Sequence, residues 1–363
     1  MKDLRRSIFI ITMMLVAVGI VMIYSASAIY AYEKMGDSLY YLKRHLIYIS
    51  IGLVMMFFAM SVDLKNIRRF SRPIMISALF LLVIVLIPHL GRETAGARRW
   101  FRLGLFNFQP SEFAKIAIVI YMADLVARKE KMMKSFVGGF VPPIMVLGLT
   151  AGLILLEPDL GTAVTIGLVT MMMLYVSGVR TAHILSILLA SMPALYLLMF
   201  SVPYRRKRIM AFINPWADKQ GSGFQIIQSF VALGSGGLFG VGLGQSRQKL
   251  FYLPASHTDF IFSIIGEELG FVGTASVVLL FALFLWQGMR IAFKVPDTFT
   301  RLLSFGIVAM VSIEAAINIG VTAGALPTKG LPLPFISYGG SGLIFHLAAV
   351  GLLLNSARRC VRR

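Results

Sequence analysis

The sequence has little charge, one cysteine and no nucleotide-binding pattern. Of its 363 residues, 14% are charged and 58% are hydrophobic, whereas a soluble domain carries about 25% charged residues. Because Cys360 is the single cysteine, the chain cannot form an internal disulfide. It contains neither G-x-G-x-x-G nor G-x-x-x-x-G-K-[ST], which argues against ATP-driven transport by this chain alone. His, Cys and Asp residues nowhere have the spacing of a zinc site.

Acidic residues are also scarce. The chain has 16 Asp and Glu against 35 Lys and Arg, a net charge of +19. In a soluble protein this excess would suggest nucleic acid as a partner. Here the basic residues lie between apolar runs, so we expect membrane lipids or a phosphorylated lipid substrate, and no nucleic acid.

Long apolar runs are what the sequence does contain. A membrane span needs about 20 mostly apolar residues, and the chain offers ten candidates. The fourth and tenth must borrow flanking residues, and Pro142-Pro143 predicts a kink in the fifth. The fold class is therefore an all-α polytopic membrane protein of about ten transmembrane helices, with the spans at Ser7–Tyr30, Leu46–Val62, Pro73–Leu90, Phe113–Val126, Phe136–Leu156, Thr162–Val179, Ile184–Ser201, Phe260–Trp286, Leu302–Ala325 and Leu343–Leu354.

The charges between the runs predict the orientation. The first apolar run resembles a signal peptide, but at about 17 residues it is too long for one, so we interpret it as an uncleaved span. Lys and Arg favour cytoplasmic N- and C-termini once the long loop 202–258, between spans seven and eight, is set aside. We expect that loop to be extracytoplasmic and to belong to one transmembrane domain over residues 1–363, in the cytoplasmic membrane.

The stretch Leu253–Phe271, LPASHTDFIFSIIGEELGF, holds an unusual concentration of acids. Asp259 lies at the outer mouth of span eight, where partial burial should raise its pKa, and acids at such places are functional candidates. The alternative is that Asp259 caps the helix. Glu267 follows eight residues later, about 12 Å along a helix, too far for the two carboxylates to act on the same bond. We therefore expect Glu267 and Glu268 to be structural acids.

Basic residues gather in clusters on the outer side, against the usual bias. Two interpretations are open: anchoring to lipid headgroups, or a cradle for a lipid-linked pyrophosphate. The clusters are Arg98, Arg99 and Arg102, then Arg205 to Arg208, then Arg247 and Lys249.

Charged residues inside or beside other spans form a second set of candidates. Glu112 and Lys115 are three residues apart on one helix face and should neutralise each other, as a structural pair or as a pair facing substrate. Asp159 belongs to the turn EPDLG at 157–161, which is either a simple turn or part of a site that needs a basic partner or a cation.

Two outer segments have distinct local patterns. Phe224 to Leu233 has apolar residues at helical spacing and predicts an interfacial helix. Leu326 to Gly342, LPTKGLPLPFISYGGSG, predicts a rigid non-helical segment, which survives at membrane depth where protein buries it or it lines a cavity. Within it, Lys329 and Ser337 are candidate substrate-binding residues, together with His257.

These segments resemble the SEDS family (shape, elongation, division and sporulation). The matching segments are GARRW, QPSEFAK, EPDLGTA, QSFVALGSGG, LPASHTDFIFSIIGEELGF and LPTKGLPLPFISYGGSG. The forms HTDFIF and FISYGG are more similar to the division branch than to the elongation branch. The chain departs from the family's pattern at Gly342, where Ser or Ala is usual, and at Ala255, where an acid is usual.

The resemblance implies a peptidoglycan glycosyltransferase that polymerises lipid II at the outer face of the bacterial cytoplasmic membrane. It also implies a class B penicillin-binding protein and other division or elongation proteins as partners. In that role Asp259 would be the general base for the acceptor hydroxyl, the basic clusters would hold the departing pyrophosphate, and a divalent cation, Mg²⁺ or Mn²⁺, is a candidate cofactor. The competing interpretations are a lipid II flippase and a scaffold that activates its partner without catalysis.

Overall fold

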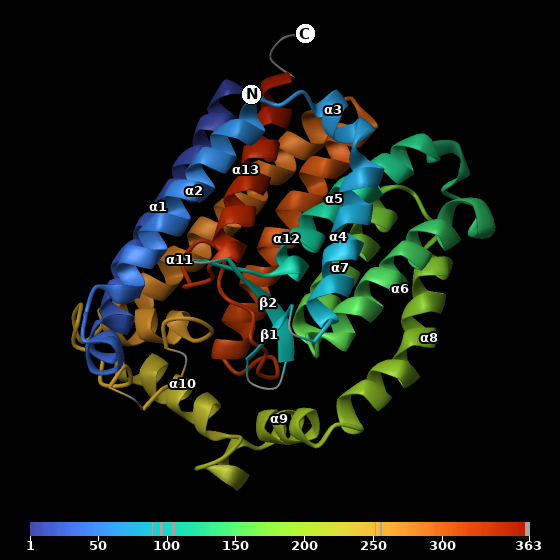
Figure 1. Ribbon diagram of the computed structural model, residues 1–363. Helices are drawn as coiled ribbons and strands as arrows, with labels where there is room; N and C mark the ends of the chain where they lie inside the picture. The colour runs from blue at the N-terminus through green and yellow to red at the C-terminus, as the bar shows by residue number, and fades with distance from the viewer. Residues whose placement is uncertain (89, 95–96, 104–105, 251, 255, 360–363) are drawn as a thin grey trace.

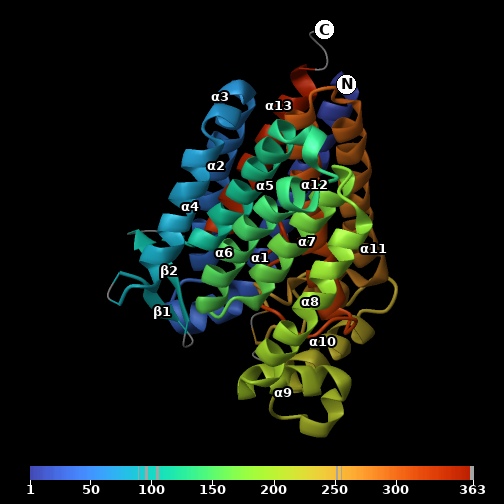
Figure 2. The ribbon, with the colours of Figure 1, turned by 90° about the vertical axis from the view of Figure 1, so that its right-hand side faces the viewer.

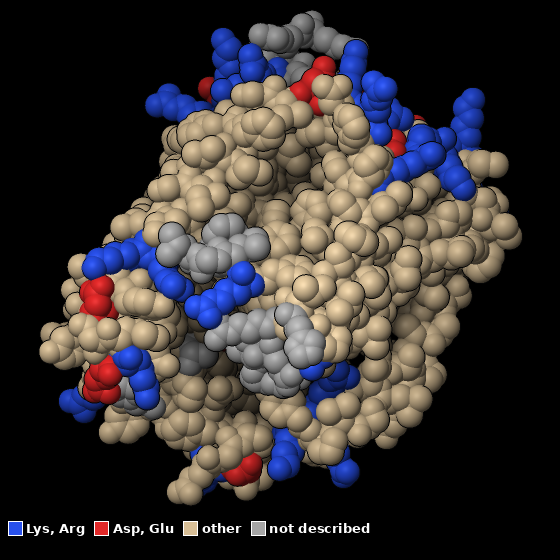
Figure 3. Space-filling model, viewed as in Figure 1, with Lys and Arg blue, Asp and Glu red and all other residues tan. Residues whose placement is uncertain are grey.

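The protein is a bundle of long helices with charged ends. This computed structural model describes the chain except residues 89, 95–96, 104–105, 251, 255 and 360–363, so Ala255 and Cys360 lie outside the described residues. Lys and Arg gather at the top and over the lower half of the view in Figure 3, with an uncharged band between them. Such a band is what a membrane-spanning protein presents to lipid tails.

Ten helices match the ten predicted spans one by one. Of the described helices, seven are long and apolar enough to span a membrane by length and composition. Two more apolar helices, α4 and α7, are shorter than these seven. The tenth, α5, is less apolar because it carries Glu112, Lys115 and Asp124. The prediction of a polytopic all-α protein is confirmed, with α1 (Lys2–Met35), α2 (Tyr40–Ser61), α4 (Ser71–Leu86), α5 (Pro110–Arg128), α6 (Val141–Leu156), α7 (Leu160–Val176), α8 (Thr181–Phe200), α11 (Ile261–Lys294), α12 (Thr298–Thr322) and α13 (Ser341–Arg359).

Shorter elements cover the two ends of the bundle. The start of α1 and the end of α13 lie together at the end of the bundle that the sequence predicts to be cytoplasmic, at the top of Figure 1. The short helix α3 (Leu64–Arg69) lies at the same end and contacts α4 and α5. At the opposite, outer end lie α9 (Pro203–Ile213) and α10 (Phe224–Ser235). The helix α10 confirms the helix predicted over Phe224 to Leu233. Three short helical turns are also present: η1 (Glu130–Met132), η2 (Phe136–Phe140) and η3 (Pro215–Asp218).

Burial is greatest in the middle of the bundle. In an 18-residue apolar stretch of α12, 78% of the residues are buried, whereas in the corresponding stretch of α8 only 6% are. Ile184 is the one buried residue of α8. Helix α2 packs along α13, and α12 contacts α5, α7 and α11. Figures 1 and 2 show α8 at the edge of the bundle, joined to it mainly through α7 and α9. The apolar surface of α8 is therefore left for lipid.

The predicted kink at Pro142-Pro143 is wrong. These prolines stand in the first turn of α6, directly after the π-helical turn η2. The first turn of a helix has no intrahelical acceptors for its N–H groups, so proline costs nothing there. The two prolines start a helix instead of bending one.

An antiparallel sheet in the loop before α5 was not predicted. Its strands are β1 (Arg92–Thr94), β2 (Ala97–Leu103) and β3 (Phe106–Phe108), in the order β1-β2-β3. Successive side chains of a strand point to opposite faces. Arg99 therefore points away from the face that Arg98 and Arg102 share, so the three arginines do not form one cluster.

The glycine-rich segment 234–244 lies against α11, backbone to backbone. Val241 and Gly242 donate their N–H groups to the carbonyls of Glu267 and Glu268, at 3.0 and 3.1 Å. A Cβ on Gly240 would stand 2.1 Å from the carbonyl oxygen of Glu268, and its φ of +80° also favours glycine. The close approach ties the outer loop to α11 without a side chain between them.

Candidate active site

Three segments that are distant in the sequence meet at the outer end of the bundle. They are the turn 257–259 before α11, the loop 326–340 before α13 and the turn 157–159 before α7. Asn318 of α12 donates from Nδ2 to the carbonyls of Asp259 (2.9 Å) and Leu331 (2.7 Å), which joins the first two. A Cβ on Gly161 would lie 3.1 Å from the Leu331 side chain, so the start of α7 packs on the same loop.

Asp259 is partly buried at this junction and its carboxylate is not neutralised by a direct partner. Among the described residues, no donor hydrogen-bonds its side chain, although Gly330 is close enough that a Cβ there would lie 3.3 Å from Oδ2. Burial raises the pKa of Asp259 to about 6, the charge of Arg208 opposes the rise and that of Asp159 adds to it. Helix α11 begins at Ile261 with Phe260 as its N-cap and no side-chain cap, so Asp259 does not cap it.

Charges of both signs surround Asp259. Arg208 of α9 donates from Nη1 to the carbonyl of Thr328 at 3.2 Å, which brings α9 to the loop 326–340. Beside Thr328, Lys329 is half-buried; burial lowers its pKa, and the charge of Asp159 opposes this. The structure thus brings together Asp259, Asp159 and Lys329 from the predicted set and adds Arg208, whose RRKR cluster was recognised in the sequence without a specific role.

Arg99 holds the turn between α6 and α7. Its Nε and Nη2 donate to the carbonyls of Glu157 and Pro158, each at 2.7 Å. The side chain of Glu157 is fully buried, and no hydrogen-bond donor of the described chain reaches either carboxylate oxygen. Burial, with a contribution from Asp159, raises the pKa of Glu157 to about 8, so this acid is largely protonated at neutral pH. Sequence reasoning had no signal for this neutral acid beside the site.

Lys249 is buried away from Asp259 in an ion pair. Its Nζ lies 2.9 Å from Glu268 Oε1, and both side chains are under 5% exposed. Glu267 accepts from Ser246 Oγ and from the backbone N–H of Arg247 (2.9 Å). Both glutamates are structural acids, as predicted. Because Lys249 is buried and paired with Glu268, it is not available to bind a pyrophosphate as predicted. Arg247 is exposed and remains a candidate for that role.

Ser337 and His257 position the turn that carries Asp259. Ser337 Oγ donates to the carbonyl of Thr258 (2.6 Å) and accepts from the N–H of Leu333 (2.8 Å), so its one hydroxyl proton is already engaged. The ring of His257 packs 4.6 Å from that of Tyr41, and burial lowers the His257 pKa to about 4, so the ring is neutral. Both were predicted to bind substrate; their contacts are with protein.

A second group of charged residues lies within the bundle. Lys115 of α5 is 2.6 Å from Glu314 of α12 and 2.9 Å from Glu112, and His346 of α13 is 2.7 Å from Glu314. All four side chains are at most 6% exposed. The predicted pair of Glu112 and Lys115 is present, but it belongs to a network that joins three helices. His346 is hydrogen-bonded to Glu314 and completes this network.

The divalent cation predicted as a candidate cofactor would need carboxylate ligands on the outer side. Over the described residues, no group of three or more His, Cys, Asp or Glu side chains is placed to hold a metal ion. Mg²⁺ can bind through one or two carboxylates together with substrate phosphates, so Asp159 and Asp259 would supply part of a coordination sphere at most.

Comparison with known proteins adds the family. Residues 5–360 match the model of the cell cycle protein family of FtsW, RodA and SpoVE. The chain belongs to this family. A probable peptidoglycan glycosyltransferase FtsW of Geobacter metallireducens is 46% identical, covering 99% of this chain and 96% of that one. The stage V sporulation protein E of Bacillus subtilis is 47% identical, covering 96% and 95%.

Two solved structures share the fold of this SEDS protein. One belongs to a peptidoglycan synthase complex that coordinates polymerisation and crosslinking, and it matches with TM-score 0.81 and 30% identity over 98% of both chains. The rod shape determining protein RodA of Thermus thermophilus matches with TM-score 0.71 and 29% identity, covering 97% and 95%. The family and the apolar helices together make this a multi-pass protein of the bacterial cytoplasmic membrane.

Proposed function

We propose that this protein is a peptidoglycan glycosyltransferase that polymerises lipid II at the outer face of the cytoplasmic membrane, with Asp259 as the general base. The observation that carries the proposal is the partly buried, unpaired carboxylate of Asp259 at the junction of three outer segments, with a pKa of about 6. A base of this pKa is largely ionised at neutral pH and still accepts a proton effectively. The names of the FtsW relatives support the reaction class.

The reaction needs one base and one place for a departing anion. Asp259 takes the proton of the acceptor hydroxyl as its oxygen attacks the anomeric carbon of the donor sugar. The bond from that carbon to the pyrophosphate oxygen breaks, and the lipid pyrophosphate leaves with the electron pair. Glu267 is in the ion-paired region behind the site, so a single-base, inverting displacement suits the residues better than a scheme with two carboxylates.

The positive charge for the pyrophosphate comes from a smaller set than the sequence suggested. Arg208 and Lys329 face Asp259 and Asp159, and exposed Arg247 lies in the same outer loop region. Fixed cations stabilise charge where it develops on the leaving group. Arg99 contributes by holding the turn of Asp159 in place, and Lys249 and Ser337 support the loops.

The alternatives remain a flippase for the same lipid and a non-catalytic scaffold for a class B penicillin-binding protein. The ion pairs that Lys115 and Glu314 form within the bundle favour the enzyme, because transport across the membrane needs groups that exchange partners. We take the penicillin-binding protein as the partner in either case, since the solved synthase complex couples polymerisation with crosslinking.

The test is polymer synthesis by the purified protein. Protein in detergent is incubated with lipid II, with and without the penicillin-binding protein, and glycan strands are resolved on gels. Strands that form with the wild type and are lost with Asp259→Asn support the enzyme. Translocation of lipid II into vesicles without any polymer would replace it by the flippase. Polymer formed equally by the Asp259→Asn protein would remove Asp259 as the base. No polymer and no translocation with either protein, while the crosslinking activity of the penicillin-binding protein is still stimulated, would leave a scaffold.

A further inference from the structure

A cavity opens at the cytoplasmic end of the bundle, at the opposite end from Asp259. It has a volume of about 640 Å³ and lies between the first turns of α1 and the last turns of α2 and α13. Pockets that bind small molecules typically measure about 300–1,000 Å³. Neither the proposed reaction nor the family assignment gives this cavity a role.

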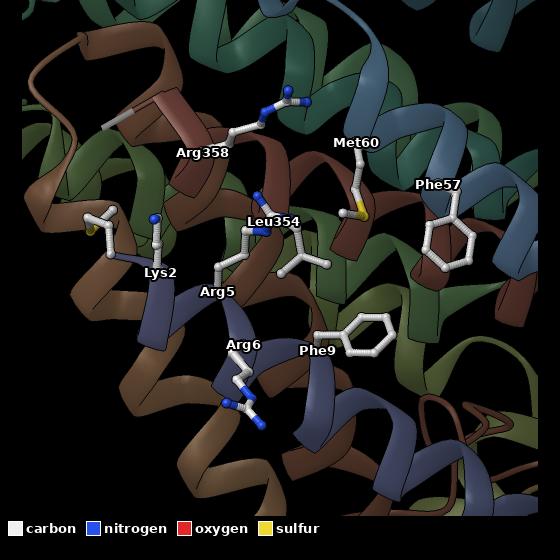
Figure 4. Close-up of a pocket in the computed structure, with 9 residues that line it drawn as sticks. Lys2, Arg5, Arg6, Phe9, Phe57, Met60, Leu354 and Arg358 are labelled. Carbon is white, nitrogen blue, oxygen red and sulfur yellow. The ribbon is translucent and has the colours of Figure 1, made fainter. Parts of the chain in front are cut away.

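The cavity combines an apolar floor with a basic rim (Figure 4). Its floor is formed by Phe9 of α1, Phe57 and Met60 of α2 and Leu354 of α13. Its rim carries Lys2, Arg5 and Arg6 of α1 and Arg358 of α13. Within the described residues, no carboxylate lines the cavity and none of these four cations forms an ion pair.

A second basic pocket at the same end provides a contrast. It has a volume of about 370 Å³ and is lined by Lys65, Arg68, Arg69 and Arg72, but also by Asp124. Asp124 accepts from Arg68 at 3.3 Å and pairs with Arg128 at 3.0 Å. This pocket has an anion of its own and no apolar floor, as expected for basic residues that only fix orientation.

We propose that the cavity between α1, α2 and α13 binds an anionic phospholipid of the inner leaflet. The headgroup phosphate lies among Arg5, Lys2 and Arg358, and the first part of an acyl chain lies on Phe9, Phe57 and Leu354. Basic pockets between transmembrane helices on the cytoplasmic side have this selectivity. Orientation alone would not require four cations on two helices around an apolar hollow. The bound lipid joins α1, α2 and α13 at an end where no ion pair between described residues does so.

The experiment measures lipid binding by native mass spectrometry of the full-length protein. The probes are phosphatidylglycerol and phosphatidylcholine with identical acyl chains. The Arg5→Gln/Arg358→Gln variant removes two cations, and Met60→Trp fills the floor without changing the charge. The control, Lys65→Gln/Arg69→Gln, removes the same charge from the other pocket. Since one Lys or Arg near the membrane surface is worth about fivefold in affinity, the double variant should bind phosphatidylglycerol about 25-fold more weakly.

Met60→Trp should also weaken the binding of phosphatidylglycerol, whereas the control variant should bind it as tightly as the wild type. Equal binding of phosphatidylcholine and phosphatidylglycerol by the wild type would overturn the proposal, as would unchanged binding in Met60→Trp. Undecaprenyl pyrophosphate that displaces phosphatidylglycerol at lower concentration would also overturn it, because the site would then take a lipid-linked pyrophosphate instead of a phospholipid. If the double arginine variant fails to fold, Met60→Trp still decides.

Discussion

The outer junction around Asp259 and the network around Lys115 both withdraw carboxylates from solvent, yet they differ in whether a cation contacts the carboxylate directly. Glu314 has Lys115 at 2.6 Å and His346 at 2.7 Å. Asp259 has no direct partner among the described residues, and its pKa rises to about 6. A buried acid that is fully paired stabilises one arrangement of helices. A buried acid without a partner is ready to exchange a proton.

The largest expected effect tests the outer half of this comparison. Asp259→Asn keeps the size of the side chain but cannot accept a proton, so polymer synthesis should fall by about 10²–10⁴-fold. Because Asp259 caps no helix, the thermal midpoint should not fall. The control is Asp218→Asn, at an exposed acid of the outer loop, which should keep the wild-type rate. Wild-type polymerisation by a folded Asp259→Asn protein would remove Asp259 as the base.

The next effect tests the paired half. Lys115→Met leaves Glu112 and Glu314 facing each other without a cation, and loss of one partner of a buried pair costs about 3–5 kcal/mol. The exchange Glu112→Lys with Lys115→Glu should not restore stability, because the new carboxylate at 115 would face Glu314. Thermal unfolding in detergent measures both. Recovery in the exchanged protein would mean that Glu314 is not part of the network.

The pH dependence of the polymerisation rate tests whether Asp259 at the outer junction has a raised pKa. Polymerisation requires ionised Asp259, so the rate should fall about tenfold per pH unit below about 6, where the raised pKa places protonation. An Asp at its ordinary pKa of about 3.9 would show this fall two units lower. The small residual rate of Asp259→Asn should stay level over the same range. A wild-type rate that is constant down to pH 4.5 would contradict the raised pKa.

Arg99 separates a structural role from a substrate role. Its two hydrogen bonds to the carbonyls of Glu157 and Pro158 predict that Arg99→Ala lowers the free energy of unfolding by about 1–3 kcal/mol. Arg99→Lys should recover part of this, since lysine lacks the planar fork. Exposed Arg102, on the other face of β2, is the control, and Arg102→Ala should change stability by less than about 0.5 kcal/mol. A lower rate with unchanged unfolding in Arg99→Ala would instead indicate contact with the pyrophosphate.

The ten spans could be predicted because each is a long apolar run, and membrane insertion depends on such runs. The sheet β1-β2-β3 could not, because its strands are short and their residues, such as Arg98, Arg99 and Trp100, do not alternate between polar and apolar. The kink at Pro142 and Pro143 was wrongly predicted because proline breaks a helix in its interior but is favoured in its first turn.

The candidate site was predicted unevenly for a similar reason. Asp259 was identifiable because an acid at the mouth of a span is costly to keep. Partners across the fold were not, since Lys115 and Glu314 are 199 positions apart. Lys249 was taken as a substrate contact because nothing local reveals that Glu268 neutralises it. Likewise, Arg98, Arg99 and Arg102 formed a cluster in sequence that the strand divides between two faces.

The smallest expected effect concerns Gly342, where the SEDS family usually has Ser or Ala. A Cβ at this position would lie 3.0 Å from Glu112 Oε2, so a serine hydroxyl would start close to that oxygen. Lys115 Nζ is 2.9 Å from Oε2 but poorly aligned, and within the described residues Oε2 accepts no hydrogen bond. We expect Gly342→Ser to raise the free energy of unfolding by about 0.5–1 kcal/mol, combining a new hydrogen bond and a better helix former less some crowding. Gly342→Ala adds the same Cβ without a donor, so the difference between the two variants in thermal unfolding isolates the hydrogen bond. If alanine stabilises as much as serine, Glu112 is already satisfied by Lys115, and the buried network is complete without a fifth member.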